Sequence, residues 1–241
     1  KYPLAKALSE IMDICRKELL CEVEIEFAAD VAPSGKLSLK LLQVRPISSY
    51  SAEQEVNFDE LKASLGTLFF ESGKALGNGF VNDVSHIVYI APDKFNSLST
   101  REIAAELAEI NNTFKSRNEG YILIGPGRWG SSDPNLGIPV IWSDISEAKM
   151  IVEYSMPGFQ VEPSQGTHFF QNLTSFGVGY LSIDTVAGDG NVDFDALGEL
   201  DSEQTMKYAV VLHTEEPITA YIERNTNRAL AGIRKNADLQ H

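Results

Sequence analysis

The amino-acid sequence predicts an α/β protein with a mixed sheet, the alternative being an α+β arrangement, and three consecutive segments carry this prediction. Residues 86–91 are rich in β-branched and aromatic side chains, as is typical of a strand. Residues 99–114 have apolar side chains at helical spacing, and residues 121–124 form a second short apolar run. A strand, a helix and a strand joined by short connections predict a βαβ unit.

The helix predicted within this unit has its own start and stop signals. Ser99 and Glu102 have the spacing of a capping box, in which each residue satisfies a backbone N–H of the first turn. Gly120 is the expected stop. The side chains predicted to face the core are those at helical spacing, Ile103, Leu107, Ile110 and Phe114.

Composition narrows the class of protein. The 241 residues are 43% hydrophobic and 22% charged, which are globular values, and they can form one or two domains. The formal net charge of −14 argues against nucleic acid or an anionic membrane as the main partner, because the Coulomb interaction would be repulsive. Two cysteines, Cys15 and Cys21, are too few for a disulfide framework, which favours a reduced, cytoplasmic protein. A homo-oligomer remains possible.

The N-terminal part has the pattern of a helix followed by a β-hairpin. Residues 3–20 have amphipathic helical spacing, and residues 22–46 alternate apolar and polar side chains on both sides of a Pro-Ser-Gly turn. A turn centred near Ser34 and Gly35 would place Glu26 roughly opposite Gln43, and directly opposed residues share a face. With Arg45 nearby, a carboxylate, an amide oxygen and a guanidinium converge. Such a trio suits a divalent cation together with a polyphosphate.

The two hairpin strands carry motifs that go beyond alternation: Glu-Ile-Glu-Phe-Ala at 24–28 and Gln-Val-Arg-Pro at 43–46, in that order after a helix. In this they resemble the end of the ATP-grasp nucleotide-binding domain of the phosphoenolpyruvate synthase and pyruvate phosphate dikinase family. The resemblance implies an ATP-dependent, kinase-like phosphotransferase in which Glu26 and Gln43 contact the magnesium of Mg–ATP and Arg45 contacts phosphate. The alternative is an ordinary hairpin whose glutamates form a solvated face.

The resemblance ends with the hairpin, and part of the expected nucleotide site is missing. An ATP-grasp site is closed by a second subdomain with a glycine-rich loop and a basic residue, and nothing of that kind precedes residue 22. The chain also begins at Lys1 and enters a helix almost at once. We therefore expect a fragment, inactive alone, whose site is completed by upstream domains of the same polypeptide. Residues 1–50 would end an ATP-grasp-like domain, and residues 51–241 would form an α/β domain of unknown function.

A phosphohistidine relay, which the family's next domain would supply, is not supported. That domain carries its histidine shortly before a Leu-Gly-Ile-Pro-like stretch, and residues 136–139 are Leu-Gly-Ile-Pro. Ser131, Ser132 and Asp133 stand where the Thr-Ser-His of the relay would be sought. The chain's one Ser-His pair, at residues 85–86, begins a predicted strand and lacks the glycines of the motif.

The glycine-rich loop at residues 125–134 is a second candidate site. It contains a formal G-x-G-x-x-G after a strand, but the Asp-Pro pair at 133–134 and Gly137 make the helix of a dinucleotide-binding turn improbable. Its glycines could instead present backbone N–H groups to an anion, with a cation, two hydroxyls and a stacking indole nearby. The alternative is a rigid structural loop whose arginine pairs with Asp133 and whose tryptophan fills the core. The candidate ligand-binding residues are Gly125, Gly127, Arg128, Trp129, Gly130, Ser131 and Ser132.

A third candidate lies in residues 165–172. On a helical turn His168, Gln171 and Asn172 would share one face and could line a pocket, with the histidine as an acid, a base or a ligand. A hydrogen-bonded structural histidine is the commoner arrangement and is favoured here. The four histidines show no recognisable metal-ligand spacing.

Two functional hypotheses follow from the sequence. In the first, the chain is part of a phosphotransferase whose cofactors are ATP and Mg²⁺ and whose partners are a nucleotide and a small-molecule substrate. In the second, residues 51–241 form a non-catalytic sensing or interaction domain that binds an anionic small molecule at the loop of residues 125–134.

Overall fold

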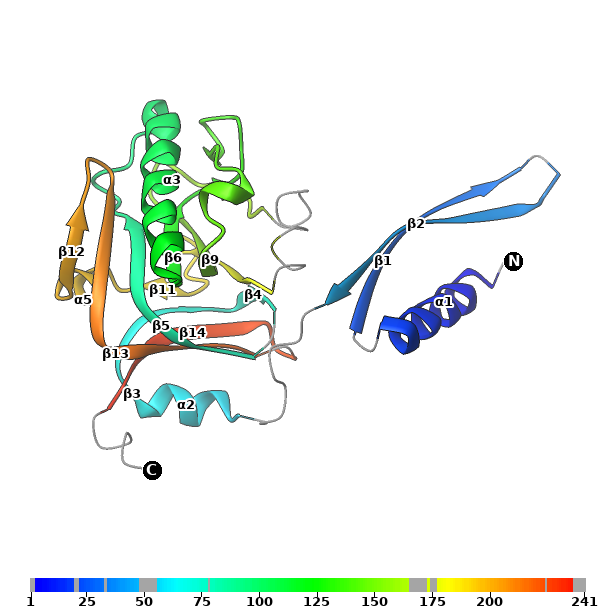
Figure 1. Cartoon of the computed structure of the whole chain (residues 1–241), viewed down its shortest axis with the longest axis horizontal. Helices are drawn as coiled ribbons and strands as arrows, with labels where there is room; N and C mark the ends of the chain where they lie inside the picture. Colours follow the sequence, from blue (N-terminus) through cyan, green and yellow to red (C-terminus); the bar gives the residue numbers. More distant parts are fainter. Residues whose placement is uncertain are drawn as a thin grey trace.

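The computed structural model describes residues 3–19, 22–32, 34–47, 56–77, 79–164, 173, 177–223 and 225–235 (Figure 1). We describe two parts separately, an N-terminal unit (residues 3–47) and a sheet domain (residues 56–235). Helices and strands are both abundant and the large sheet is mixed, so the α/β prediction is confirmed. Among the described residues, no helix is both long and apolar enough to cross a membrane. The predicted domain boundary falls in residues 48–55, which lie outside the described residues.

The N-terminal unit consists of the predicted helix and hairpin. Its elements are α1 (Leu4–Leu19), β1 (Glu22–Val31) and β2 (Leu37–Ile47). The helix packs on β1, where Val23 is buried. Among the described residues of this unit, five large apolar side chains are exposed to solvent: Ile14, Phe27, Val31, Leu41 and Leu42.

In the described part of the sheet domain, ten hydrogen-bonded strands form one mixed sheet. The strands are β3 (Leu65–Ser72), β4 (Lys74–Leu76), β5 (Gly79–Ile90), β6 (Tyr121–Pro126), β9 (Ala148–Ser155), β10 (Gly179–Asp184), β11 (Asn191–Val192), β12 (Asp201–Thr205), β13 (Ala209–Glu223) and β14 (Arg228–Arg234). A separate small ladder pairs β7 (Arg128–Trp129) with β8 (Gly137–Ile138). The helical elements are α2 (Phe58–Ser64), η1 (Ser97–Ser99), α3 (Thr100–Arg117), η2 (Trp142–Asp144) and α5 (Phe194–Gly198).

The strand order separates a parallel block from an antiparallel block. The order is β11-β3-β14-β13-β5-β6-β9-β10-β4, with β12 added to β13. Strands β5, β6, β9 and β10 pair in parallel, and α3 connects β5 to β6, so the predicted βαβ unit is confirmed. Because the four strands are parallel, their carboxyl ends lie at the same edge of the sheet, where ligands bind in many open α/β folds.

Helix α3 covers one face of this parallel block (Figure 1). The four predicted core residues of the helix are all buried. The predicted termini are wrong in detail: the Ser99 side chain makes no cap hydrogen bond, and Glu102 bonds to Lys207 and Tyr208 instead. The helix ends at Asn118 in the left-handed conformation, before Gly120 is reached. Asparagine tolerates this conformation better than most residues, which explains the earlier stop.

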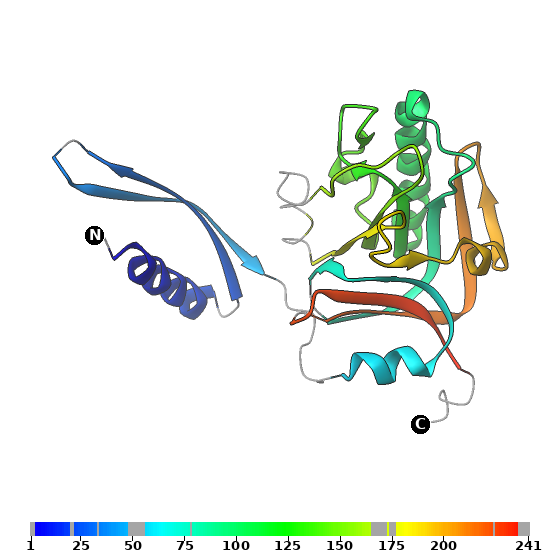
Figure 2. The same cartoon turned by 180° about the vertical axis from the view of Figure 1, so that it is seen from behind.

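The opposite face of the sheet encloses a second core. This core joins residues of β3 and β14 to residues of β9 and β10, from distant places in the strand order, so the sheet must be strongly bent (Figure 2). The Ser72 hydroxyl on β3 donates a hydrogen bond of 2.6 Å to the carbonyl of Ser182 on β10. The bend therefore brings β3 beside the parallel block.

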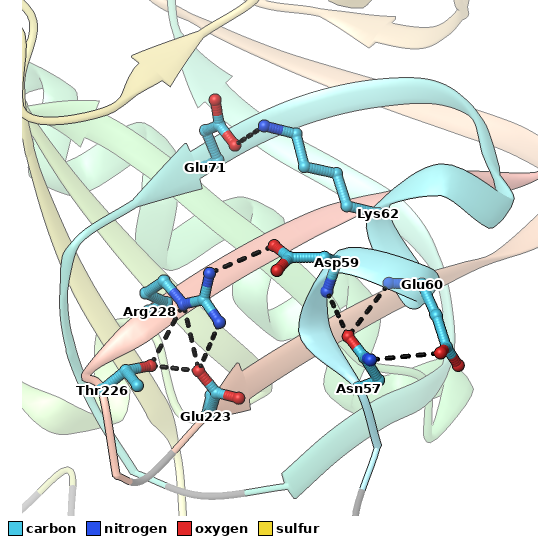
Figure 3. Close-up of polar contacts among 8 residues, drawn as sticks. All are labelled: Asn57, Asp59, Glu60, Lys62, Glu71, Glu223, Thr226 and Arg228. Carbon is cyan, nitrogen blue, oxygen red and sulfur yellow. Dashed lines mark hydrogen bonds and ion pairs between the residues drawn. The ribbon is translucent and has the colours of Figure 1, made fainter.

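A polar cluster attaches α2 to strands β13 and β14 (Figure 3). Arg228 contacts Glu223 at 3.0 Å and Asp59 at 3.2 Å, and its guanidinium lies 4.1 Å from the centre of the Phe58 ring. Asn57 caps the helix by accepting hydrogen bonds from two backbone N–H groups of the first turn. These groups satisfy one another, so we assign the cluster a structural role.

Candidate functional site

The register of the hairpin confirms the predicted pairing of its two motifs. Glu26 is the partner of Gln43, and Glu24 is the partner of Arg45 two positions further along. Opposed residues share a face, so the Glu26 carboxylate and the Gln43 amide extend from the same side of the hairpin. Both side chains are exposed. The carboxylate and amide oxygens that a magnesium–phosphate site requires thus lie on one surface.

A β-bulge directly after this pair explains the sequence pattern of the second strand. Glu26 pairs with Gln43, whereas the next residue, Phe27, pairs with Leu41, so Leu42 is an extra residue. Before the bulge the partners of the apolar β1 residues are Val44 and Pro46; after it they are the leucines at odd positions. The bulge changes which positions of β2 share the apolar face. Glu26 and Gln43 thereby remain opposite each other, although the apolar positions of β2 change from odd to even numbers at the bulge.

The glycine-rich loop leaves the carboxyl end of β6 and enters the short strand β7. As expected, the third glycine of the motif does not open a helix, so the geometry of a dinucleotide-binding turn is absent from this described segment. Gly127 and Gly130 both have positive φ, at 68° and 79°, which explains why glycine suits these two positions.

The backbone donors of this loop are used within the protein. The N–H groups of Gly127, Arg128 and Gly130 donate to the carbonyls of Tyr154, Leu136 and Ile138, at 2.8–3.0 Å. The N–H of Trp129 donates to the Glu153 carboxyl at 3.0 Å. Four successive N–H groups are therefore already satisfied, and an anion placed here would have to displace these hydrogen bonds.

The Trp129 indole lies in the core between α3 and the sheet, only 2% exposed. Its ring covers Gly125, where an added Cβ would approach ring carbon Cζ2 to 2.4 Å, and its N–H lies 3.3 Å from the Val152 carbonyl. The indole has no open face for a base or a sugar. The structural alternative, in which this tryptophan fills the core, is what the structure shows.

The remaining candidates of the loop are also engaged or peripheral. Arg128 donates to the Glu162 carbonyl at 2.6 Å and lies 3.7 Å from that residue's carboxylate, so its partner is Glu162 and the expected pairing with Asp133 is wrong. The Ser131 hydroxyl exchanges hydrogen bonds with the backbone of Asp133, and Ser132 is exposed. We conclude that the loop is a structural element held in place by hydrogen bonds within the protein.

Glu153, on the parallel strand β9, connects several segments at the edge of the sheet where the parallel strands end. It is 4% exposed, and its carboxyl accepts hydrogen bonds from the Trp129 N–H, the Ser164 N–H at 2.9 Å and the Tyr180 hydroxyl at 2.5 Å, and one from the Ser164 hydroxyl. These donors come from the glycine-rich loop, the segment after β9 and strand β10. One buried carboxyl therefore joins three segments that are separate in sequence.

The environment of Glu153 also changes its acidity. Burial raises the pKa of this carboxyl above its usual value of 4.5, because the charged form loses hydration, and the surrounding hydrogen bonds offset part of that rise. Burial likewise raises the pKa of Tyr180, so its hydroxyl remains protonated and able to donate. Glu153 was not among the residues predicted from the sequence. The available signal was one glutamate within the apolar and aromatic run of residues 150–154.

The histidines give no catalytic constellation in the described part of the chain. His168, Gln171 and Asn172, the third candidate site, lie outside the described residues. His86 on β5 contacts Glu203 at 2.9 Å and faces His213 across the ladder, and burial lowers the pKa of His86. Within the described residues, no group of three or more His, Cys, Asp or Glu side chains is arranged to hold a metal ion.

Comparison with known proteins gave no match: no family model, no curated protein and no solved structure is similar to this chain. The resemblance of the hairpin to a nucleotide-binding domain therefore depends on its own motifs and their register.

Proposed function

We propose that the N-terminal unit forms one wall of a Mg–ATP site in a cytoplasmic ATP-dependent phosphotransferase similar to phosphoenolpyruvate synthase and pyruvate phosphate dikinase. The observation that carries the proposal is the pairing of Glu26 with Gln43, which places a carboxylate and an amide oxygen on one face. Oxygen ligands of this kind are those that Mg²⁺ prefers, and the ion usually binds through one or two carboxylates together with substrate phosphates. The residues present therefore fit the group.

Within this proposal each motif residue has a defined role. Glu26 and Gln43 hold the magnesium ion, which would neutralise phosphate charge when bound. Arg45, two residues beyond Gln43 on β2, supplies a fixed planar cation for phosphate oxygens. The second wall of the site would come from other domains of the same polypeptide. The acceptor substrate would be a small molecule bound elsewhere.

The test is binding of Mg–ATP to the chain, followed by titration calorimetry or by amide NMR signals of the hairpin. We expect weak binding that requires magnesium. Arg45→Ala and Glu26→Gln should each reduce the affinity roughly tenfold, as for loss of one charge-assisted contact. Arg16→Ala and Glu10→Gln make the same chemical changes on the exposed surface of α1 and should leave binding unchanged. Equal affinity in Arg45→Ala and Arg16→Ala would overturn the proposal.

The geometry does not favour the second hypothesis, an anion site at the glycine-rich loop. Gly127, Arg128, Trp129 and Gly130 donate their N–H groups internally, and the Arg128 guanidinium is bound to Glu162. We therefore do not propose this loop as a binding site.

A further inference from the structure

A small cavity of about 50 Å³ lies at the carboxyl ends of β9 and β10. A space of this size admits a water-sized group or a similarly compact ion. The polar residues that line it are Lys74, Glu153, Ser155, Ser182 and Asp184. None of these residues belongs to the hairpin, so the cavity is independent of the proposed Mg–ATP wall.

The sheet register explains why these side chains meet. Ser182 on β10 is paired with Glu153 on β9 and, on its other side, with Lys74 on β4. Two residues further along, Asp184 is paired with Ser155. Register partners and positions two residues apart share one face of a sheet, so all five side chains extend toward the cavity.

The Ser182 hydroxyl is the unusual member of this row. The residue is 5% exposed, and its Oγ is a buried polar atom without a hydrogen-bond partner among the described residues. A buried hydroxyl without a partner costs free energy, and native structures rarely retain one unless a water or ligand satisfies it. The hydroxyl oxygen can accept a hydrogen bond or coordinate a cation.

The charges around the cavity favour a positive occupant. Lys74 is paired with Asp189 at 2.5 Å, so its charge is balanced. Asp184 accepts three hydrogen bonds on Oδ1, from the Ser155 hydroxyl and the N–H groups of residues 186 and 187, and these hold its pKa below the usual range. Lys74 also attracts Asp184, but it is one cation beside two aspartates, Asp184 and Asp189, so an excess of negative charge remains around the cavity.

We propose that this cavity binds a compact monovalent cation, with the Ser182 hydroxyl and the Asp184 carboxylate as its principal ligands. The cation is either an inorganic ion or the ammonium group of a small molecule, because both combine one positive charge with a preference for oxygen ligands. The occupant satisfies the Ser182 hydroxyl and the excess negative charge at the same time.

The test is a titration of the chain with potassium, sodium, ammonium or methylammonium chloride, followed by the amide NMR signals of Ser182 and Asp184. Tetramethylammonium chloride keeps the ionic strength constant, since this cation is too large for the cavity and has no N–H to donate. We expect saturable shifts with at least one compact cation. Shifts with potassium or sodium chloride would indicate an inorganic ion, whereas shifts with methylammonium chloride would indicate the ammonium group of a small molecule.

Two variants and a control assign the ligands. Ser182→Ala removes a hydroxyl that lacks a partner, so folding should be preserved while binding weakens roughly tenfold, as for loss of one hydrogen bond to a charged group. Asp184→Asn should weaken binding at least as much. Ser202→Ala, on the exposed strand β12, should leave binding unchanged.

Three results would overturn the proposal. The compact cations could produce only the shifts seen with tetramethylammonium, which would indicate a site for water alone. Acetate or phosphate could produce saturable shifts instead, which would assign the cavity to anions. Finally, Ser182→Ala could bind the cations as tightly as the unaltered chain.

Discussion

The N-terminal unit and the sheet domain differ in where their chemistry and their stability lie. In the hairpin, Glu26 and Gln43 are exposed, and so are several large apolar side chains, including Phe27 and Leu42 at 38% and 58%. In the sheet domain the conspicuous loop residue, Trp129, is 2% exposed and forms part of the core. Residues that look functional in sequence are thus accessible in one region and structural in the other.

The difference has a physical cause. A two-stranded hairpin with a single helix can bury few side chains, so its polar face stays open to a ligand or to neighbouring domains. A bent sheet covered by a helix buries both faces of its central strands, so a loop crossing its edge must satisfy its backbone donors internally. The first region is suited to supply one wall of a site. The second provides its own small cavity beside Glu153.

Replacing one large apolar side chain in each region tests this contrast most strongly. Trp129→Ala should lower the free energy of unfolding of the sheet domain by about 3–5 kcal/mol, because a buried aromatic side chain leaves a cavity. Phe27→Ala, in the hairpin, should cost roughly 1 kcal/mol or less, because the ring is already partly solvated. Chemical denaturation followed by circular dichroism measures both, and similar losses would remove the contrast.

A smaller effect is expected from filling the space beneath the indole. Gly125→Ala places a Cβ 2.4 Å from Trp129 Cζ2, so the ring must shift, at a cost of about 1–3 kcal/mol. Gly198→Ala is the matched control, since an added Cβ there meets nothing within 4 Å and alanine favours the helix. Denaturation midpoints compare the two variants. If they were equally stable, the close packing of this loop would be in doubt.

The smallest effect is the pH dependence of Glu153. Its folded pKa is raised above the unfolded value near 4.5, so its stabilisation is fully present below that value and is lost as pH rises through the folded pKa. The side chain of the Glu153→Gln variant cannot titrate. Its NH₂ group replaces one of the oxygens that accept hydrogen bonds from N–H groups, so the variant also has a constant loss of stability that does not depend on pH. Between pH 5 and pH 8, the unaltered protein should therefore lose stability relative to this variant.

The control for this experiment is Glu162→Gln, since the Glu162 side chain is 94% exposed. Its stability difference from the unaltered protein should not change with pH in the way that the Glu153→Gln difference does. A difference between the unaltered protein and Glu153→Gln that stayed constant from pH 5 to pH 8 would contradict the assigned direction of the Glu153 pKa.

The sequence predicted those parts of the structure that depend on local periodicity. The apolar spacing of Ile103, Leu107, Ile110 and Phe114 identified the buried face of α3, which follows from the fixed repeat of a helix. The predicted pairing of Glu26 with Gln43 is also present, but it depends on the bulge at Leu42, which strand alternation does not predict. The helix termini were less predictable, because the Glu102 carboxylate bonds to residues more than a hundred positions away.

Local pattern could not decide the role of the glycine-rich loop or find the carboxyl-end cavity. The loop's sequence was equally compatible with an anion cradle and a structural turn, and the carbonyls that accept its N–H groups decide between them. Glu153, Ser182 and Lys74 meet only because three strands distant in sequence pair in one register.

By itself, the sequence determined the α/β class and the amphipathic helices, because each depends on neighbours a few residues apart. The opposed motif pair of the hairpin was predicted as well, although its register also requires the bulge at Leu42. Only the tertiary structure decided that Trp129 lies in the core, that Arg128 is bound to Glu162, and that Ser182 lies buried without a partner. The physical reason is that hydrogen-bond satisfaction and burial are set by contacts between distant segments, and no local repeat encodes them.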